Sequence, residues 1–106
     1  MNLSGEICHS LIKLKYLKYL DLSFNSFKAM SVPQLFGSLK NLIYLNLSSA
    51  GFSGSIPSNL RNLSGLQYLD LSSEYLDDID FEYCNDLFVE NIEWMIGLVS
   101  LKYLGA

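Results

Sequence analysis

Four tyrosines, Tyr19, Tyr44, Tyr68 and Tyr103, stand at matching points of a repeated sequence pattern. Three of them are followed by Asp or Asn two residues on and by serine two residues after that, in the series Tyr19-x-Asp21-x-Ser23, Tyr44-x-Asn46-x-Ser48 and Tyr68-x-Asp70-x-Ser72. Tyrosine gives a binding surface large contact area at low entropy cost, and carboxylates favour a basic or amine-bearing ligand. The candidate ligand-binding residues are therefore Tyr19, Asp21, Tyr44, Asn46, Tyr68, Asp70 and Tyr103.

The same tyrosines also have a purely structural interpretation. If the copies of the pattern stack with their strands side by side, the rings lie about 4.8 Å apart and fix one another by cross-strand stacking. They would then cover the sheet without binding anything. The sequence leaves both interpretations open.

Regularly spaced leucines mark the elements that must position these tyrosines. The middle copy of the frame reads Leu39, Leu42, Leu45, Leu47, Phe52, Ile56 and Pro57. The frame also starts at Leu14 and at Leu63, and a partial copy is Leu98, Leu101 and Leu104. The spacing is 25 residues from Leu20 to Leu45 and 24 from Leu45 to Leu69. The leucines of one copy cannot be buried within it, so the copies must stack and share one core.

The frame predicts an α/β solenoid. Within each copy the Leu-x-Leu alternation predicts a short strand, with the leucines inward and the tyrosine and its polar neighbour outward. Successive strands of this kind are parallel, which requires a crossover of a dozen or more residues. We expect a short parallel β-sheet on the concave face and short helical or 3-10 turns on the convex face, with Pro33 and Pro57 each opening a turn.

The whole chain is predicted to form one segment of repeats. It divides into a partial repeat at 1–13, repeats from 14, 39 and 63, an insertion at about 74–93 and a partial repeat at 94–106, without complete caps. The insertion is inferred because Leu69 and Leu104 are 35 residues apart, about eleven more than one repeat. After it, Ile92, Met95 and Ile96 are expected to face the core, and Trp94 to pack against the base of the insertion.

An asparagine is expected to tie neighbouring coils together. Asn25 ends the first full frame, where its side-chain amide can bond backbone groups of adjacent coils. The matching residues are Ala50 in the second repeat and Glu74 in the third. If such asparagines form a ladder along the solenoid, with one asparagine as the rung of each coil, the sequence predicts a single rung, Asn25.

Two motifs support a family resemblance. Residues 17–25 fit L-x-x-L-x-L-x-x-N in full, and residues 53–57 read S-G-S-I-P. This combination resembles the plant-type leucine-rich repeat of receptor-like proteins and receptor-like kinases. The segments 14–27 and 39–57 look like the first repeats of the receptor-like proteins that sense fungal elicitors.

The resemblance implies a recognition module without catalytic activity. It would be part of a plant cell-surface receptor ectodomain that binds a peptide, glycan or protein partner, and a co-receptor ectodomain, in defence or developmental signalling. Its place would be the extracellular face of the plasma membrane, without a cofactor. The alternative is a secreted or soluble leucine-rich-repeat inhibitor or scaffold that acts by protein–protein interaction.

Other chemistry finds little support in the residues. His9 is the only histidine, and nothing pairs with it for Ser/His/Asp catalysis. No kinase motif is present, so a kinase label would belong to a domain absent from this chain. Eight of the eleven acidic residues lie between Glu74 and Glu93, but residues 66–96 lack the glycine that an EF-hand loop needs, so we expect a solvated acidic excursion and no metal site.

Net charge and hydrophobicity exclude two further classes of partner. The net charge of −4 argues against nucleic acid. The apolar runs are far shorter than the ~20 residues that span a bilayer, so no membrane contact is expected, and the start of the chain does not read as a signal peptide. Cys8 and Cys84 sit about three coils apart, too far for a disulfide.

Three Asn-Leu-Ser sequons make Asn2, Asn46 and Asn62 glycosylation candidates. The repeat itself demands this tripeptide, so the match alone is weak. A glycan on Asn46 would block the concave face, whereas Asn62 lies at the convex edge and is the preferred candidate.

Overall fold

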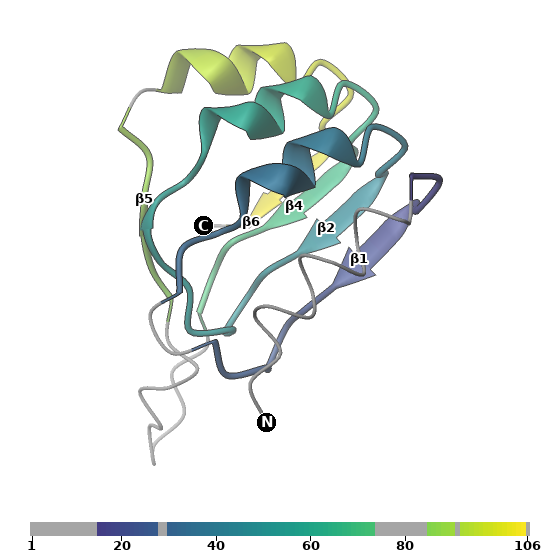
Figure 1. The fold of residues 1–106 in the computed structure, drawn as a ribbon. Coiled ribbons are helices and arrows are strands. Elements are labelled where there is room, and N and C mark those ends of the chain that lie inside the picture. Colours follow the sequence, from purple (N-terminus) through teal and green to yellow (C-terminus); the bar gives the residue numbers. More distant parts are fainter. Residues whose placement is uncertain (1–14, 28–29, 74–84, 91, 106) are drawn as a thin grey trace.

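The computed structural model describes residues 15–27, 30–73, 85–90 and 92–105. Four short strands form one parallel sheet in the order β1-β2-β4-β6 (Figure 1). Their bounds are β1 Tyr19–Asp21, β2 Tyr44–Asn46, β4 Tyr68–Asp70 and β6 Tyr103–Gly105. The described chain makes a first coil (15–38), a second (39–62), a third (63–97) and the start of a fourth (98–105). The predicted α/β solenoid with a parallel sheet is confirmed.

Three short 3-10 helices cover the other side of the solenoid. They are η1 Gln34–Ser38, η2 Ser58–Asn62 and η4 Ile92–Gly97, and they lie in a row opposite the sheet (Figure 1). Pro33 and Pro57 are the N-cap residues of η1 and η2, so each proline opens its turn. Proline suits this place because the first N–H groups of a helix have no partner within the helix.

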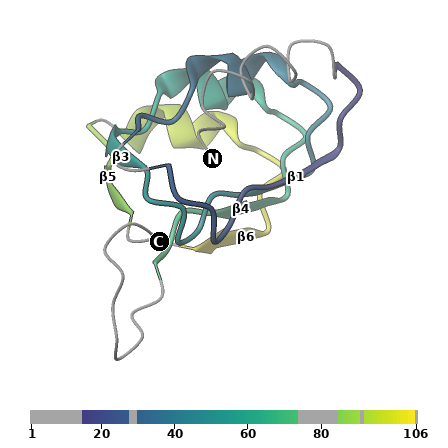
Figure 2. The same cartoon turned by 60° about the horizontal axis from the view of Figure 1, so that its bottom comes forward.

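A second, smaller parallel sheet lies between the strands and the helices. It pairs β3 Ser53–Ser55 with β5 Asp86–Phe88 (Figure 2). The sequence frame did not predict it. It shows that residues 86–88 pair like any other coil, although they fall inside the expected insertion at 74–93.

The core is the leucine frame that the sequence predicts. Leu42, Leu45, Leu47, Leu60 and Leu63 are fully buried, and the rings of Phe27 and Phe52 stack with centroids 4.7 Å apart. Burial of this kind contributes about 25 cal/mol per Å² of apolar surface, which makes it the dominant stabilising term.

The last coil departs from the predicted core. Leu104 occupies the position of Leu45 and Leu69, yet 45% of it is exposed, because no described strand lies beyond β6. Ile96 was expected to face the core and is instead 78% exposed, since η4 is the last helix of the row. Met95 packs partly against the core as expected, and Trp94 is buried in it.

The asparagine ladder has a second rung, Asn85, which matching the repeats of the chain by their spacing did not identify. Asn85 Nδ2 donates to the carbonyl oxygens of Leu71 and Ser72 at 3.1 and 3.3 Å. Asn25 Nδ2 makes the same two bonds in its own coil, to Leu22 and Ser23 at 3.0 and 3.3 Å. Asn85 and not Glu74 therefore holds the ladder position of the third coil.

Several predictions fall on residues outside the described ranges. They concern the partial repeat at 1–13, the sequon at Asn2, His9 and the two cysteines. The acidic residues between 74 and 84 also lie outside them.

Candidate ligand-binding face

Strand register places the four tyrosines in one column. Tyr19 pairs with Tyr44, Tyr44 with Tyr68, and Tyr68 with Tyr103. Asp21, Asn46, Asp70 and Gly105 form the second column in the same register. The structure thus brings together all seven candidate residues on the sheet.

The rings of the column stack on one another. The ring centroids are 4.3 Å apart between Tyr44 and Tyr68 and 4.4 Å apart between Tyr68 and Tyr103, with interplanar angles of 11° and 7°. Neighbours therefore cover both faces of Tyr68, and its hydroxyl and ring edge are what it can present to a ligand. The structural interpretation of the tyrosines accounts for this stacking, and it leaves binding by edges and hydroxyls open.

The stack is interrupted at Tyr19. Its ring centroid lies 5.5 Å from that of Tyr44, with the planes tilted by 37°. Tyr19 is also 65% exposed, against 47% for Tyr103 at the other end of the column. The largest accessible tyrosine surface thus belongs to the first coil.

Each Asp or Asn of the second column is anchored by the serine that follows it. The Oδ1 atom of Asp21 accepts from the backbone N–H of Ser23 at 2.9 Å and from its Oγ at 2.6 Å. The pairs Asn46–Ser48 and Asp70–Ser72 repeat both bonds at 3.0 and 2.6 Å. The serine column thus fixes the side-chain rotamer of its partner in all three coils.

In the second and third coils a further hydrogen bond joins the Asp or Asn side chain to the tyrosine hydroxyl two residues earlier. Asn46 Nδ2 donates to the hydroxyl oxygen of Tyr44 at 3.2 Å, and the Tyr68 hydroxyl donates to Asp70 Oδ2 at 3.3 Å. Both side-chain oxygens of Asp70 are thus engaged, and only 9% of the residue is exposed. Gly105 packs so closely that a Cβ there would lie 2.8 Å from Asp70 Cγ.

This geometry changes the expected electrostatics of the face. Asp21 is exposed and keeps a carboxylate available for a ligand, whereas Asp70 is covered. The pKa of the Tyr68 phenol is raised well above its ordinary value, first by desolvation and then by the negative charge of Asp70 and by Tyr44. Tyr68 therefore remains a neutral hydrogen-bonding group at physiological pH.

The two sequons within the described ranges differ in accessibility. Asn46 is partly buried and both atoms of its amide are hydrogen-bonded. Asn62 is exposed and is the last residue of η2, a helix of the row opposite the sheet (Figure 1). Only Asn62 presents its side chain to solvent without giving up bonds of the sheet.

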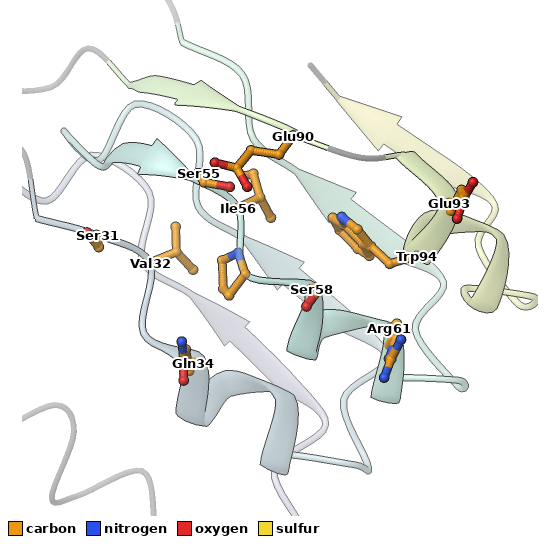
Figure 3. A pocket seen from close by; sticks show the side chains of 11 residues that line it. Ser31, Val32, Gln34, Ser55, Ile56, Ser58, Arg61, Glu90, Glu93 and Trp94 are labelled. Atoms are coloured by element: carbon orange, nitrogen blue, oxygen red, sulfur yellow. The ribbon is translucent and has the colours of Figure 1, made fainter.

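A second hollow, which the sequence did not predict, lies beside β3 and the helices. It is a cavity of about 640 Å³ bordered by Trp94, Arg61, Glu90 and Ser55 (Figure 3). Figure 3 shows the Trp94 ring turned inward from η4 and the Glu90 carboxylate beside Ser55 and Ile56. A sequence signal existed, because Val89 to Leu98 is two residues longer than the matching Ile56 to Leu63.

The described residues contain no group of three or more His, Cys, Asp or Glu side chains placed to hold a metal ion. No helix among them is both long and apolar enough to cross a membrane. The sheet face itself offers hydrogen-bonding groups, ring edges and the exposed carboxylate of Asp21.

Comparison with known proteins decides the family. A family model described as "Leucine rich repeat" matches residues 15–76. The chain belongs to the leucine-rich repeat family. Leucine-rich repeats account for the stacked coils, the parallel sheet and the asparagine ladder seen above.

Curated relatives include plant receptor-like proteins. The chain is 43% identical over 102 residues to "Receptor-like protein EIX1" of Solanum lycopersicum, which covers 96% of this chain and 9% of that protein. Identity to "Receptor-like protein EIX2" of the same plant is 51% over 59 residues, 56% of this chain and 6% of the relative. It is 37% over 102 residues to "Probable disease resistance protein RXW24L" of Arabidopsis thaliana, 96% of this chain and 10% of the relative.

These comparisons confirm the resemblance to plant receptor-like proteins that the motifs indicated. The chain spans about a tenth or less of the length of these curated relatives. The leucine-rich repeats described here therefore correspond to a small part of such a protein.

Proposed function

We propose that this chain is a non-catalytic recognition segment of a plant receptor-like protein, and that it binds a peptide, glycan or protein partner on its parallel sheet. The observation that carries the proposal is the tyrosine column, whose members align in register across the four strands and alternate with the buried Leu45 and Leu69. Tyrosine is enriched among the residues that dominate binding energy.

The column offers a ligand two kinds of contact. Its interior members, Tyr44 and Tyr68, are preorganised by stacking and by their bonds to Asn46 and Asp70, so binding costs them little side-chain entropy. Tyr19 and Tyr103 stand at the ends and contribute exposed ring surface. A rigid aromatic strip of this kind suits an extended ligand that crosses several coils.

The relatives' names supply the biological setting of the proposal. Receptor-like and disease-resistance proteins both occur among them. We place the segment on the extracellular face of the plasma membrane, where it contributes to defence signalling together with a co-receptor ectodomain. A glycan on Asn62 fits this setting, because it would project away from the sheet.

The proposal is tested by asking which face selects a ligand. Binders are selected from a random displayed 12-residue peptide library against the 106-residue chain. Their affinities are then measured by calorimetry for two double variants, Tyr44→Ala/Tyr68→Ala on the sheet and Lys40→Ala/Arg61→Ala on the helical side.

The expected result is a loss of about 30-fold, or ~2 kcal/mol, for the tyrosine variant and little change for the basic variant. Circular dichroism of both variants verifies that the fold is retained. Binders that lose affinity only with the Lys40 and Arg61 variant would place recognition on the helical side and overturn the proposal.

A further inference from the structure

The three copies of the Tyr-x-Asp/Asn-x-Ser unit are not equivalent. In the second and third coils the side chain of the Asp or Asn bonds both the serine and the tyrosine hydroxyl. In the first coil Asp21 bonds Ser23 only, and no bond joins it to Tyr19. The unit of the first coil is therefore open, with a tyrosine ring and a carboxylate oxygen both left available.

Exposure follows the same division. Asp70 is 9% exposed and lies against Gly105, whereas Asp21 is exposed and Tyr19 is 65% exposed. The tilt of 37° between Tyr19 and Tyr44, against 11° for the next pair, leaves the Tyr19 ring less covered by its neighbour. The one exposed carboxylate of the second column, Asp21, thus lies on the same strand as the most exposed ring of the tyrosine column, Tyr19.

A second exposed aromatic residue, Phe24, lies in the turn that follows β1. Phe24 is 54% exposed and its backbone is held at φ 56°, a conformation that favours Gly or Asn and is unusual for a bulky side chain. The repeat geometry imposes this angle, because Ser49 takes the matching place with φ 46°. The first coil therefore carries a large exposed ring where a small polar residue would be less strained.

We infer that Tyr19 and Asp21 form a subsite for the positively charged side chain of an arginine or lysine in a peptide or protein ligand. The Asp21 Oδ2 atom, which has no partner among the described residues, accepts from the cation. The exposed Tyr19 ring contacts it as an aromatic surface. Phe24 follows three residues further along the chain. This inference rests on the proposed function and names the ligand chemistry of one end of the same face.

The carboxylate oxygen of Asp21 that bonds no described residue favours a cation as the occupant. A carboxylate that bonds only Ser23 on one oxygen keeps its acceptor capacity on the other, and charge-assisted hydrogen bonds are the stronger kind. Exposed Lys18 precedes Tyr19 and opposes a cation at longer range, so its removal is expected to strengthen binding. Covered Asp70 offers no such group.

The chain supplies its own matched control for a test. Asn46 makes the same serine bonds as Asp21, so Asp21→Asn is expected to keep the local structure while removing the charge. Asp70→Asn removes an equal charge from a covered position two coils away. The probes are N-acetyl-arginine methylamide and its neutral isostere N-acetyl-citrulline methylamide, titrated into the ¹⁵N-labelled 106-residue chain by NMR.

The arginine probe is expected to bind with millimolar affinity and to shift the amide signals of residues 19–24. The citrulline probe is expected to bind at least about threefold more weakly. Asp21→Asn should weaken the arginine probe at least about threefold, Asp70→Asn should leave it unchanged, and Lys18→Gln should strengthen it. Tyr19→Leu serves as a second variant if Asp21→Asn alters the spectrum, and is expected to weaken the probe as well.

Equal binding of the two probes, or equal loss for the Asp21 and Asp70 variants, would overturn the subsite. Its failure is distinguishable from failure of the proposed function. Library binders that depend on Tyr44 and Tyr68, together with an arginine probe that ignores the first coil, would remove the subsite and leave the function. Binders that ignore the sheet, with an arginine probe that requires Asp21, would do the reverse.

Discussion

Asn85 Nδ2 donates to the carbonyl oxygen of Leu47, 38 positions earlier in the chain, at 2.8 Å. The Oδ1 atom of the same side chain accepts from the backbone N–H groups of Ala50 and Phe52, both at 3.1 Å. One amide therefore satisfies three backbone groups of the second coil, in addition to two carbonyls of its own. The second coil has Ala50 where the first has Asn25, and so it has no asparagine of its own at this position. Asn85 of the third coil makes these backbone hydrogen bonds instead.

The first prediction concerns this amide. Asn85→Ala would leave the N–H groups of Ala50 and Phe52 without their acceptor in a part-buried turn, and each such loss costs about 1–3 kcal/mol. We expect the free energy of unfolding to fall by about 2–4 kcal/mol in urea denaturation. Exposed Asn62→Ala is the control and should change it by less than ~0.5 kcal/mol. Similar stabilities for the two variants would show that the ladder bond is replaced by water.

The sequence predicted the parts of this fold that depend on periodic burial. Leu45 and Leu69 could be assigned inward and Tyr44 and Tyr68 outward because each strand alternates with a period of two. The strand register followed from the 24- and 25-residue spacing of the leucines.

What the sequence could not give depends on individual hydrogen bonds and on neighbours. The role of Asn85 was missed because alignment by spacing assigns Glu74, and only the side-chain contacts show otherwise. In the candidate site, Asp21 and Asp70 look identical in sequence. Asp70 is covered by the Tyr68 hydroxyl and Gly105, whereas Asp21 lies on β1, which has a neighbouring described strand on one side only.

The second prediction is that residues 74–84 interrupt an otherwise complete repeat. The backbone N–H of Asn85 donates to Ser73 Oγ at 2.7 Å, so the two ends of the interruption lie together. Joining Ser73 to Asn85 recreates Leu-Ser-Ser-Asn after Asp70, which matches Leu22 to Asn25 in the first coil. We expect the shortened chain to keep the parent's circular dichroism spectrum and a cooperative urea transition.

A matched deletion controls this experiment. Removing eleven residues from 53 to 63 would excise β3 and η2 and should abolish the cooperative transition. Loss of cooperativity in the 74–84 deletion as well would mean that the interruption contributes to the core.

The third prediction concerns the close approach of η1 and η2. A Cβ atom added to Gly37 would lie 2.8 Å from the Cβ of Asn59, so the two helices would have to separate. Gly37→Ala is expected to cost about 1–3 kcal/mol through overpacking. Exposed Gly65 is the matched control, because its added Cβ meets nothing nearer than the Leu42 carbonyl oxygen at 4.0 Å. Gly65→Ala should be neutral or slightly stabilising, and equal effects at the two glycines would exclude a packing constraint at Gly37.

The last prediction follows from the raised pKa of Tyr68. A phenol in the unfolded chain loses its proton near pH 10, whereas in the folded chain desolvation and the Asp70 carboxylate keep the Tyr68 proton bound to higher pH. The folded state then binds more protons than the unfolded state above about pH 10, so stability falls as pH rises through that range. Below pH 10 both states keep this proton, and the group adds no pH dependence.

Urea midpoints between pH 8 and 11.5 test this argument. The midpoint of the parent should decrease more steeply above pH 10 than that of Tyr68→Phe, which has no phenol to titrate at this position. Asp70→Asn should give an intermediate slope, because the amide removes the charge while desolvation by the neighbouring rings remains. Parallel pH profiles for the parent and Tyr68→Phe would show that the Tyr68 proton is not held by the folded sheet.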